Sequence, residues 1–93
     1  MLAMDQSPPT TLERQRVERL ADSVMNGADP AASLGPTISV RLGYVIARML
    51  GEACATAWAG AQGRVMNLST PTFRRFRALV ELFDVAVTLP RVP

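Results

Sequence analysis

Ten arginines supply all the positive side-chain charge of this 93-residue sequence, which contains no lysine and no histidine. A guanidinium stays charged at any working pH and can form two parallel hydrogen bonds to a phosphate or a guanine. Because the net charge is only +2, the location of the arginines matters more than their number. Six of them lie in or near the two most apolar segments, and these are the candidates for phosphate contacts: Arg41, Arg48, Arg64, Arg74, Arg75 and Arg77.

The residue types that most often perform catalysis or bind metals are scarce. Without histidine there is no histidine-based triad, imidazole metal site or imidazole switch. The eight carboxylates are scattered, with no spacing typical of a metal site or an acid–base pair. The single cysteine, Cys54, excludes an intrachain disulfide, fits a reducing compartment and is expected in the core. We therefore expect no enzyme, no catalytic residue, no metal and no cofactor.

The elements that would position the arginines are helices. Residues 1–9 predict a flexible tail that ends at a Pro-Pro pair, and residues 10–93 a single helical domain. Thr10 and Glu13 form a capping-box pattern that opens a helix over residues 11–26, with Gly27 as its C-terminal cap. Residues 27–36, which contain two prolines and small side chains, predict a linker.

The most apolar stretch, residues 40–64, is compatible with two structures. A single helix would align its apolar residues on one face: Leu42, Val45, Ile46, Met49, Ala53 and Ala57. Alternatively, helices over residues 40–50 and 53–61 would flank a left-handed turn at Gly51. A glycine inside a helix costs about 1 kcal/mol relative to alanine. Because Gly43 and Gly60 also weaken an unbroken helix, the glycines favour the break at Gly51.

The C-terminal third begins with the clearest helix signal. Ser69 and Thr70 offer a hydroxyl cap, and Pro71 suits the first helical position. The helix is expected over residues 71–83, and residues 85–89 predict either a brief strand that pairs in an oligomer or an extended tail. The predicted fold is all-α: a small four-helix domain with a helix-turn-helix and a short C-terminal β tail.

The sequence offers no segment suited to a lipid bilayer. The run of residues 38–61 is long enough, but it contains Arg41, Arg48 and Glu52, each of which is costly at bilayer depth. The N-terminal residues lack the basic lead and apolar stretch of a signal peptide. We therefore expect no membrane association and a cytoplasmic location.

With the break at Gly51, residues 40–89 resemble a helix-turn-helix of the Xre/Cro repressor family. The resemblance is carried by IARMLG at residues 46–51, then Thr56, Ala57, Trp58 and Gly60, and by FRRFRALVELFDV at residues 73–85. It implies that Ala47 allows close packing of the first helix and that Gly51 makes the turn. The helix of residues 53–61 would then enter the major groove of DNA, and the capped helix after residue 70 would complete the core.

Two features depart from that family. Glu52 follows the turn glycine where the family usually has an apolar residue, and it would bring negative charge near the phosphates. The expected recognition helix also has few side chains that read bases, because only Thr56, Gln62 and Arg64 could form hydrogen bonds to base edges.

Trp58 would pack beside the sugar-phosphate backbone. The six arginines named above would supply the phosphate contacts.

These patterns support two functional hypotheses. The first is a homodimeric transcriptional regulator, of phage or bacterial origin, that binds double-stranded DNA through residues 53–61 and arginine–phosphate contacts. The alternative is a helical protein-interaction module that acts as a homodimer, as an inhibitor, adaptor or phage accessory factor, with Trp58 as a hot spot. The break at Gly51 discriminates between them, because one straight helix over residues 40–62 removes the scaffold of the DNA reader.

Overall fold

A computed structural model describes residues 7–61 and 71–92 of the chain. These residues form four helices, α1 (Thr11–Met25), α2 (Pro30–Leu34), α3 (Val40–Ala61) and α4 (Pro71–Ala86). Two very short strands, β1 (Ile38–Ser39) and β2 (Arg91–Val92), complete the described fold. The predicted small and mostly helical domain is confirmed. The predicted cap at Ser69 and Thr70 lies outside the described residues.

The start of α1 is the predicted capping box. The Thr10 hydroxyl accepts a hydrogen bond from the Glu13 amide at 3.2 Å, and the Glu13 carboxylate accepts one from the Thr10 amide at 2.9 Å. Both contacts satisfy amides that the first turn of a helix leaves without intrahelical partners. After α1 the chain turns at Gly27, whose φ of 100° lies in a region that residues other than glycine rarely adopt.

The linker predicted over residues 27–36 contains a short helix, α2, that the sequence analysis did not predict. Asp29 caps α2 by accepting a hydrogen bond from the Ala32 amide at 3.0 Å, and Pro30 occupies the first turn. Gly35, with φ of 84°, ends the helix. A polar cap followed by proline is the kind of start signal that the sequence also shows, with a hydroxyl in place of the carboxylate, at residues 69–71.

The predicted break at Gly51, and with it the helix-turn-helix, is wrong: α3 is one helix of 22 residues. Gly51 is not among the glycines with positive φ, so it makes no left-handed turn. Buried residues before it, Ile46 and Met49, and after it, Ala57, lie on one face of a continuous helix. The helix therefore continues one apolar face through Gly51, and it tolerates the cost of about 1 kcal/mol for a helical glycine.

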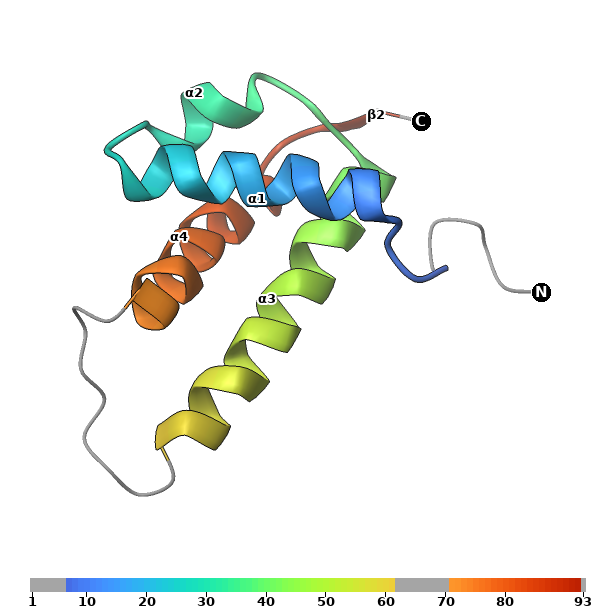
Figure 1. Ribbon diagram of the computed structural model, residues 1–93. Helices are drawn as coiled ribbons and strands as arrows, with labels where there is room; N and C mark the ends of the chain where they lie inside the picture. The colour runs from blue at the N-terminus through green and yellow to red at the C-terminus, as the bar shows by residue number, and fades with distance from the viewer. Residues whose placement is uncertain (1–6, 62–70, 93) are drawn as a thin grey trace.

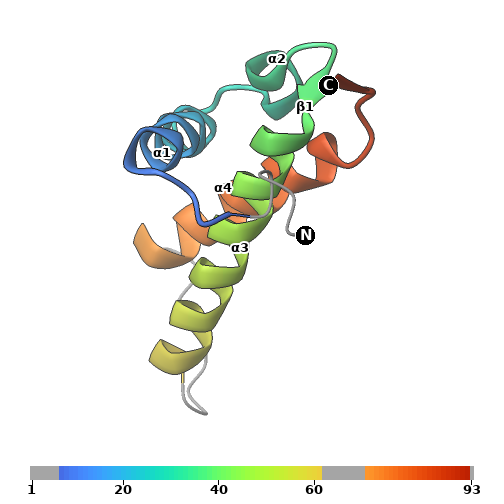
Figure 2. The ribbon, with the colours of Figure 1, turned by 90° about the vertical axis from the view of Figure 1, so that its right-hand side faces the viewer.

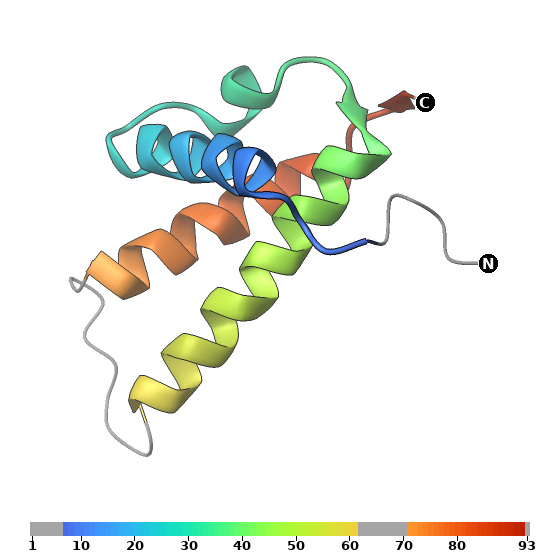
Figure 3. The ribbon, with the colours of Figure 1, turned by 45° about the vertical axis from the view of Figure 1, so that its right-hand side comes forward.

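The helices enclose the core in a simple arrangement (Figure 1). Helices α3 and α4 run antiparallel and diverge at one end, and α1 lies across them near the other end. Figure 3 shows the same wedge of α3 and α4 beneath α1 from a second direction. The side chains that are almost completely buried come from α1, α3 and α4: Val17, Val45, Ile46, Leu79 and Leu82. The C-terminal half of α3 projects beyond the other helices (Figure 2).

The end of the described chain differs from the predicted strand over residues 85–89. Helix α4 continues through Ala86, which is buried, because its apolar periodicity extends past Phe83. The strand begins later, at Arg91, and pairs parallel with β1 in the register Ile38–Arg91 and Ser39–Val92. The Ile38 amide donates a hydrogen bond to the Pro90 carbonyl at 3.1 Å. The pairing partner is therefore in the same chain, not in a second protomer.

Within the ranges 7–61 and 71–92, no helix combines the length and the apolar character that a membrane span requires.

Candidate interaction surfaces

Arg41, one of the arginines predicted to contact phosphate, forms hydrogen bonds within the chain instead. Its guanidinium forms two hydrogen bonds with the carboxylate of Glu13, at 2.6 and 2.7 Å. It also donates to the carbonyls of Ser7 and Pro8, at 2.9 and 3.2 Å. Arg41 therefore ties α3 to the first turn of α1 and to the residues before it. The bonds from Arg41, followed by the bond from the Thr10 amide, lower the pKa of Glu13 from 4.5 to about 2.

Two further ion-pair sets fix α1 on the wedge of α3 and α4. Arg14 of α1 binds Glu52 of α3 through two parallel hydrogen bonds of 2.7 and 2.8 Å, which lower the pKa of Glu52. Arg75 of α4 lies 3.3 Å from the Asp22 carboxylate and 3.4 Å from that of Glu18. The resemblance to a helix-turn-helix implied that Glu52 lies near DNA phosphates. In the structure, Glu52 of α3 pairs with Arg14 of α1.

The remaining predicted site residues are separated by the fold. Arg48 lies beside Tyr44, whose hydroxyl is 3.4 Å from the guanidinium, and is otherwise exposed. The Thr56 hydroxyl donates to the Glu52 carbonyl of the preceding turn at 3.0 Å. Trp58 is 79 % exposed on the projecting half of α3. Gln62 and Arg64 lie outside the described residues.

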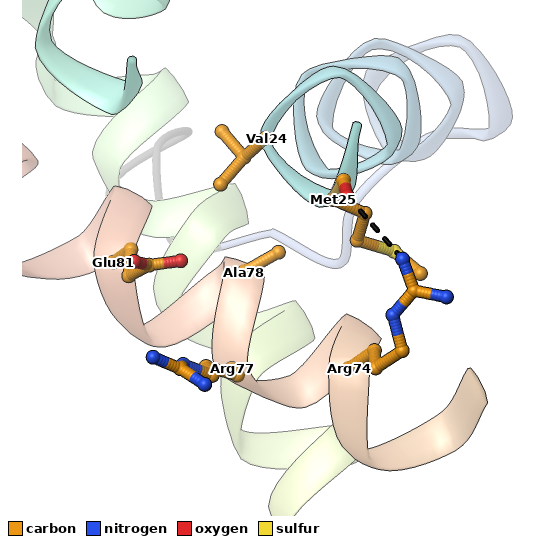
Figure 4. A pocket seen from close by; sticks show the side chains of 6 residues that line it. All are labelled: Val24, Met25, Arg74, Arg77, Ala78 and Glu81. Atoms are coloured by element: carbon orange, nitrogen blue, oxygen red, sulfur yellow. Dashed lines mark hydrogen bonds between the residues drawn. The ribbon is translucent and has the colours of Figure 1, made fainter. Parts of the chain in front are cut away.

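Arg74 and Arg77 line a shallow hollow of about 190 Å³ between α4 and the C-terminal end of α1 (Figure 4). The guanidinium of Arg74 reaches the end of α1 and donates to the Met25 carbonyl at 3.3 Å. A cation at this position offsets the partial negative charge of a helix C-terminus, and the last turn of α1 has no basic residue of its own. Glu81 lines the same hollow as Arg77, so the basic cluster is partly balanced by an acid.

A larger groove, of about 390 Å³, opens between α3 and α4 where the two helices diverge. Met49 and Ala53 of α3 and Leu79 of α4 line it together with polar residues, among them Thr56 and Thr72. Its charged residues are those of the ion pairs above: Glu18, Glu52 and Arg75. The groove therefore presents an apolar strip between charges that are already matched.

The most unusual surface of the described residues is the side of α3 turned away from the core. Residues spaced alternately four and three apart share one side of a helix. On α3 this spacing selects six uncharged residues, which we name the outward face: Val40, Tyr44, Ala47, Gly51, Cys54 and Trp58. Four of them are exposed and two are half-buried. The outward face combines large exposed apolar side chains at its ends with small residues between them.

The outward face is the feature that the sequence interpretation missed, although its spacing is visible in the sequence. Cys54, expected in the core, is exposed, so that prediction is wrong. The cysteine lies about 100° around the helix from the half-buried Ala53 and on the same side as Trp58.

Comparison of the chain with protein-family models, with curated proteins and with solved structures found no match. The resemblance to the Xre/Cro family therefore stays a prediction.

Proposed function

We propose that this chain is a helical protein-interaction module whose docking surface is the outward face of α3. The observation that carries the proposal is Trp58, which is 79 % exposed although it is the largest apolar side chain of the sequence. Tryptophan supplies much contact area at low entropic cost and is enriched among the residues that dominate protein–protein binding energy. Val40, at the other end of the same face, is also exposed.

The charge distribution supports a protein partner. The centres of protein–protein interfaces are depleted in charged residues, and the outward face contains none. Affinity for nucleic acid arises mainly from contacts between basic residues and phosphates. Among the arginines predicted for that role, Arg41 and Arg75 are ion-paired within the chain, and Arg74 caps α1.

Duplex DNA binding stays a prediction of the sequence. An electrophoretic shift series with genomic fragments over a range of salt concentrations tests it directly. Binding that weakens steeply with salt, and loses part of that salt dependence in Arg77→Ala, would support a DNA reader. If no fragment shifts at low salt, the protein-interaction module remains.

The proposed docking surface can be tested with a photoreactive amino acid at position 55. Ala55 is exposed beside Trp58 and Gly51, so a probe there reaches whatever covers the outward face. We expect a covalent adduct with a protein in cells that express the chain. The same probe at the exposed Gln15, on α1, is the matched control and should give no such adduct.

The specificity of that adduct decides the proposal. It should disappear when Trp58→Ala is added to the probe at position 55, because the aromatic anchor of the surface is then lost. Equal adducts at positions 15 and 55, or none at position 55, would contradict the assignment of the outward face as the docking surface.

A further inference from the structure

The described residues give no structural reason for Gly43 and Gly51, which both lie inside α3. Neither has a positive φ, and a Cβ atom built on either would meet nothing within 4 Å. Alanine at each position would favour the helix by about 1 kcal/mol. In helices, glycine permits another backbone to approach closely. Nothing in the described residues makes that approach, although the exposed Trp58 on the same side of α3 also lacks a covering element.

The order of side-chain sizes along the outward face is nearly symmetric about Gly51. Tyr44 lies seven residues before Gly51 and Trp58 seven residues after it, and the small residues Ala47 and Cys54 lie four residues before it and three after it. Large residues therefore flank a small centre at equal distances. Such a surface is complementary to itself under a two-fold rotation, because each copy offers the same small centre and the same aromatic ends.

We propose that the partner of the outward face is a second copy of this chain, which packs its own α3 antiparallel against the first with the two-fold axis near Gly51. This inference rests on the proposed function. The small centre lets the helices approach closely at the crossing, and Tyr44 of each copy lies beside Trp58 of the other. Offset or edge-to-face aromatic pairs of this kind add stability beyond the area they bury.

The charges beside the outward face favour the same partner. The face itself is uncharged and is matched by an identical uncharged face, whereas the exposed sides of α1 and α4 carry charges such as Arg19 and Asp84. In an antiparallel pair each flank meets the same flank of the other copy. One flank of α3 contains Arg48 together with Glu52, which Arg14 of the same copy already pairs, so this flank brings no unmatched carboxylate into the contact.

The size of this contact predicts a dimer that dissociates on dilution. A helix of 22 residues is about 33 Å long. One pair of such helices lies near the lower limit of roughly 1,200 Å² for stable protein interfaces. Self-association should therefore be visible in the micromolar range rather than being permanent.

Sedimentation of the full chain over a wide concentration range, combined with its fluorescence, tests the proposal. Trp58 is the only tryptophan of the sequence, so its emission reports the outward face alone. We expect a monomer–dimer equilibrium and a blue shift of emission that follows the dimer fraction. Gly51→Leu should raise the dissociation constant by about tenfold or more, equal to about 1.4 kcal/mol or more, because a large side chain blocks the crossing.

The matched control is Gly60→Leu, which makes the same change on the same helix but on the side that faces the groove. An added Cβ at Gly60 also meets nothing within 4 Å, so neither variant should unfold the protomer, as circular dichroism would verify. Gly60→Leu should dimerise like the unmodified chain. Equal loss of dimer in both variants would overturn the assignment to the outward face.

The failure of this inference differs from the failure of the proposed function. A purified chain that stays monomeric at all concentrations, while position 55 forms a specific adduct with another protein in cells, overturns the second copy and leaves the interaction module standing. A monomer without any specific adduct at position 55 overturns both. A dimer that Gly51→Leu does not weaken places self-association elsewhere and overturns the inference alone.

Discussion

At the scale of single residues, two of the arginines predicted to contact phosphate, Arg41 and Arg75, pair with carboxylates within the fold, and Arg14 does the same. Arg14, Arg41 and Arg75 each join α1 to another helix through carboxylates. Ion pairs that solvent reaches contribute little individually, and even the half-buried Arg41–Glu13 pair is partly exposed, so these pairs are better understood as fixing the orientation of α1 than as a main source of stability. The Arg41–Glu13 pair is the most connected, because the Glu13 carboxylate also completes the capping box.

The low pKa of Glu13 predicts a loss of stability in acid. Its folded pKa of about 2 lies below the value of 4.5 for a free glutamate, so the native state prefers the ionised form. The stabilisation is fully present above about pH 4.5 and is lost as the pH falls towards 2. Glu13→Gln should therefore lower the free energy of unfolding at pH 7 and make progressively less difference as the pH falls through 2.

Denaturant unfolding of both proteins between pH 2 and pH 7 measures this difference. Glu81→Gln, at an exposed glutamate of α4, is the matched control and should change the free energy of unfolding less. A difference between Glu13→Gln and the unmodified chain that stays constant down to pH 2 would show that the carboxylate charge is not what stabilises the contact.

At the scale of elements, α3 is a helix with two apolar sides. One side, with Ile46 and Met49, is buried against α1 and α4, and the other is the outward face. A helix that is apolar on two sides is normally buried on both. The uncovered side of α3 is thus the element-level reason to expect a partner, and the continuity of the helix through Gly51 is what aligns Tyr44 with Trp58.

Substitution of two glycines by alanine distinguishes a helical glycine from a turn glycine. Gly51→Ala should stabilise the dilute protomer by up to about 1 kcal/mol, since the backbone is helical and the space is open. Gly27→Ala is the matched variant and should destabilise by about 1–2 kcal/mol, because its φ of 100° is unfavourable for alanine. Thermal or denaturant unfolding at low protein concentration measures both.

The signs of the two effects are the decisive result. If Gly51→Ala destabilises the dilute protomer as Gly27→Ala does, then Gly51 is a turn residue and the backbone bends there. That outcome would restore the two-helix interpretation of residues 40–61.

At the scale of the whole molecule, the short parallel pair of β1 and β2 connects the last described residues to the start of α3. Ile38, which is buried, donates from its amide to Pro90, and Arg91 and Val92 extend the pairing. The contact joins segments more than fifty residues apart in the sequence. It holds the chain after α4 against the N-terminal end of α3, far from the projecting half that carries Trp58 (Figure 2).

Removal of residues 91–93 should loosen this junction without unfolding the helices. We expect the Ile38 amide to exchange with solvent faster, because the strand that positions its acceptor is gone. The amides of Leu79 and Leu82, in the buried part of α4, serve as the internal control and should keep their protection. Hydrogen exchange followed by NMR measures all three. Equal acceleration at all three amides would show that the pairing contributes to global stability instead.

The sequence by itself determined the features that depend on local rules. The capping box at Thr10, the glycine after α1 and the helix that begins at Pro71 follow from the preferences of neighbouring residues for particular backbone angles. The fold class follows from apolar periodicity. Local rules gave the wrong answer at Gly51, where a small local penalty competes with burial that involves α1 and α4.

Only the tertiary structure decided which arginines form ion pairs within the chain and which face of α3 the other helices cover. Arg41 and Glu13 are 28 residues apart, and Arg14 and Glu52 are 38 apart, so no local pattern pairs them. Likewise, both apolar sides of α3 have helical spacing, and the sequence does not indicate which side the other helices cover. The physical reason is that burial and ion pairing depend on distances between residues in space. The packing of α1 across α3 and α4 determines those distances.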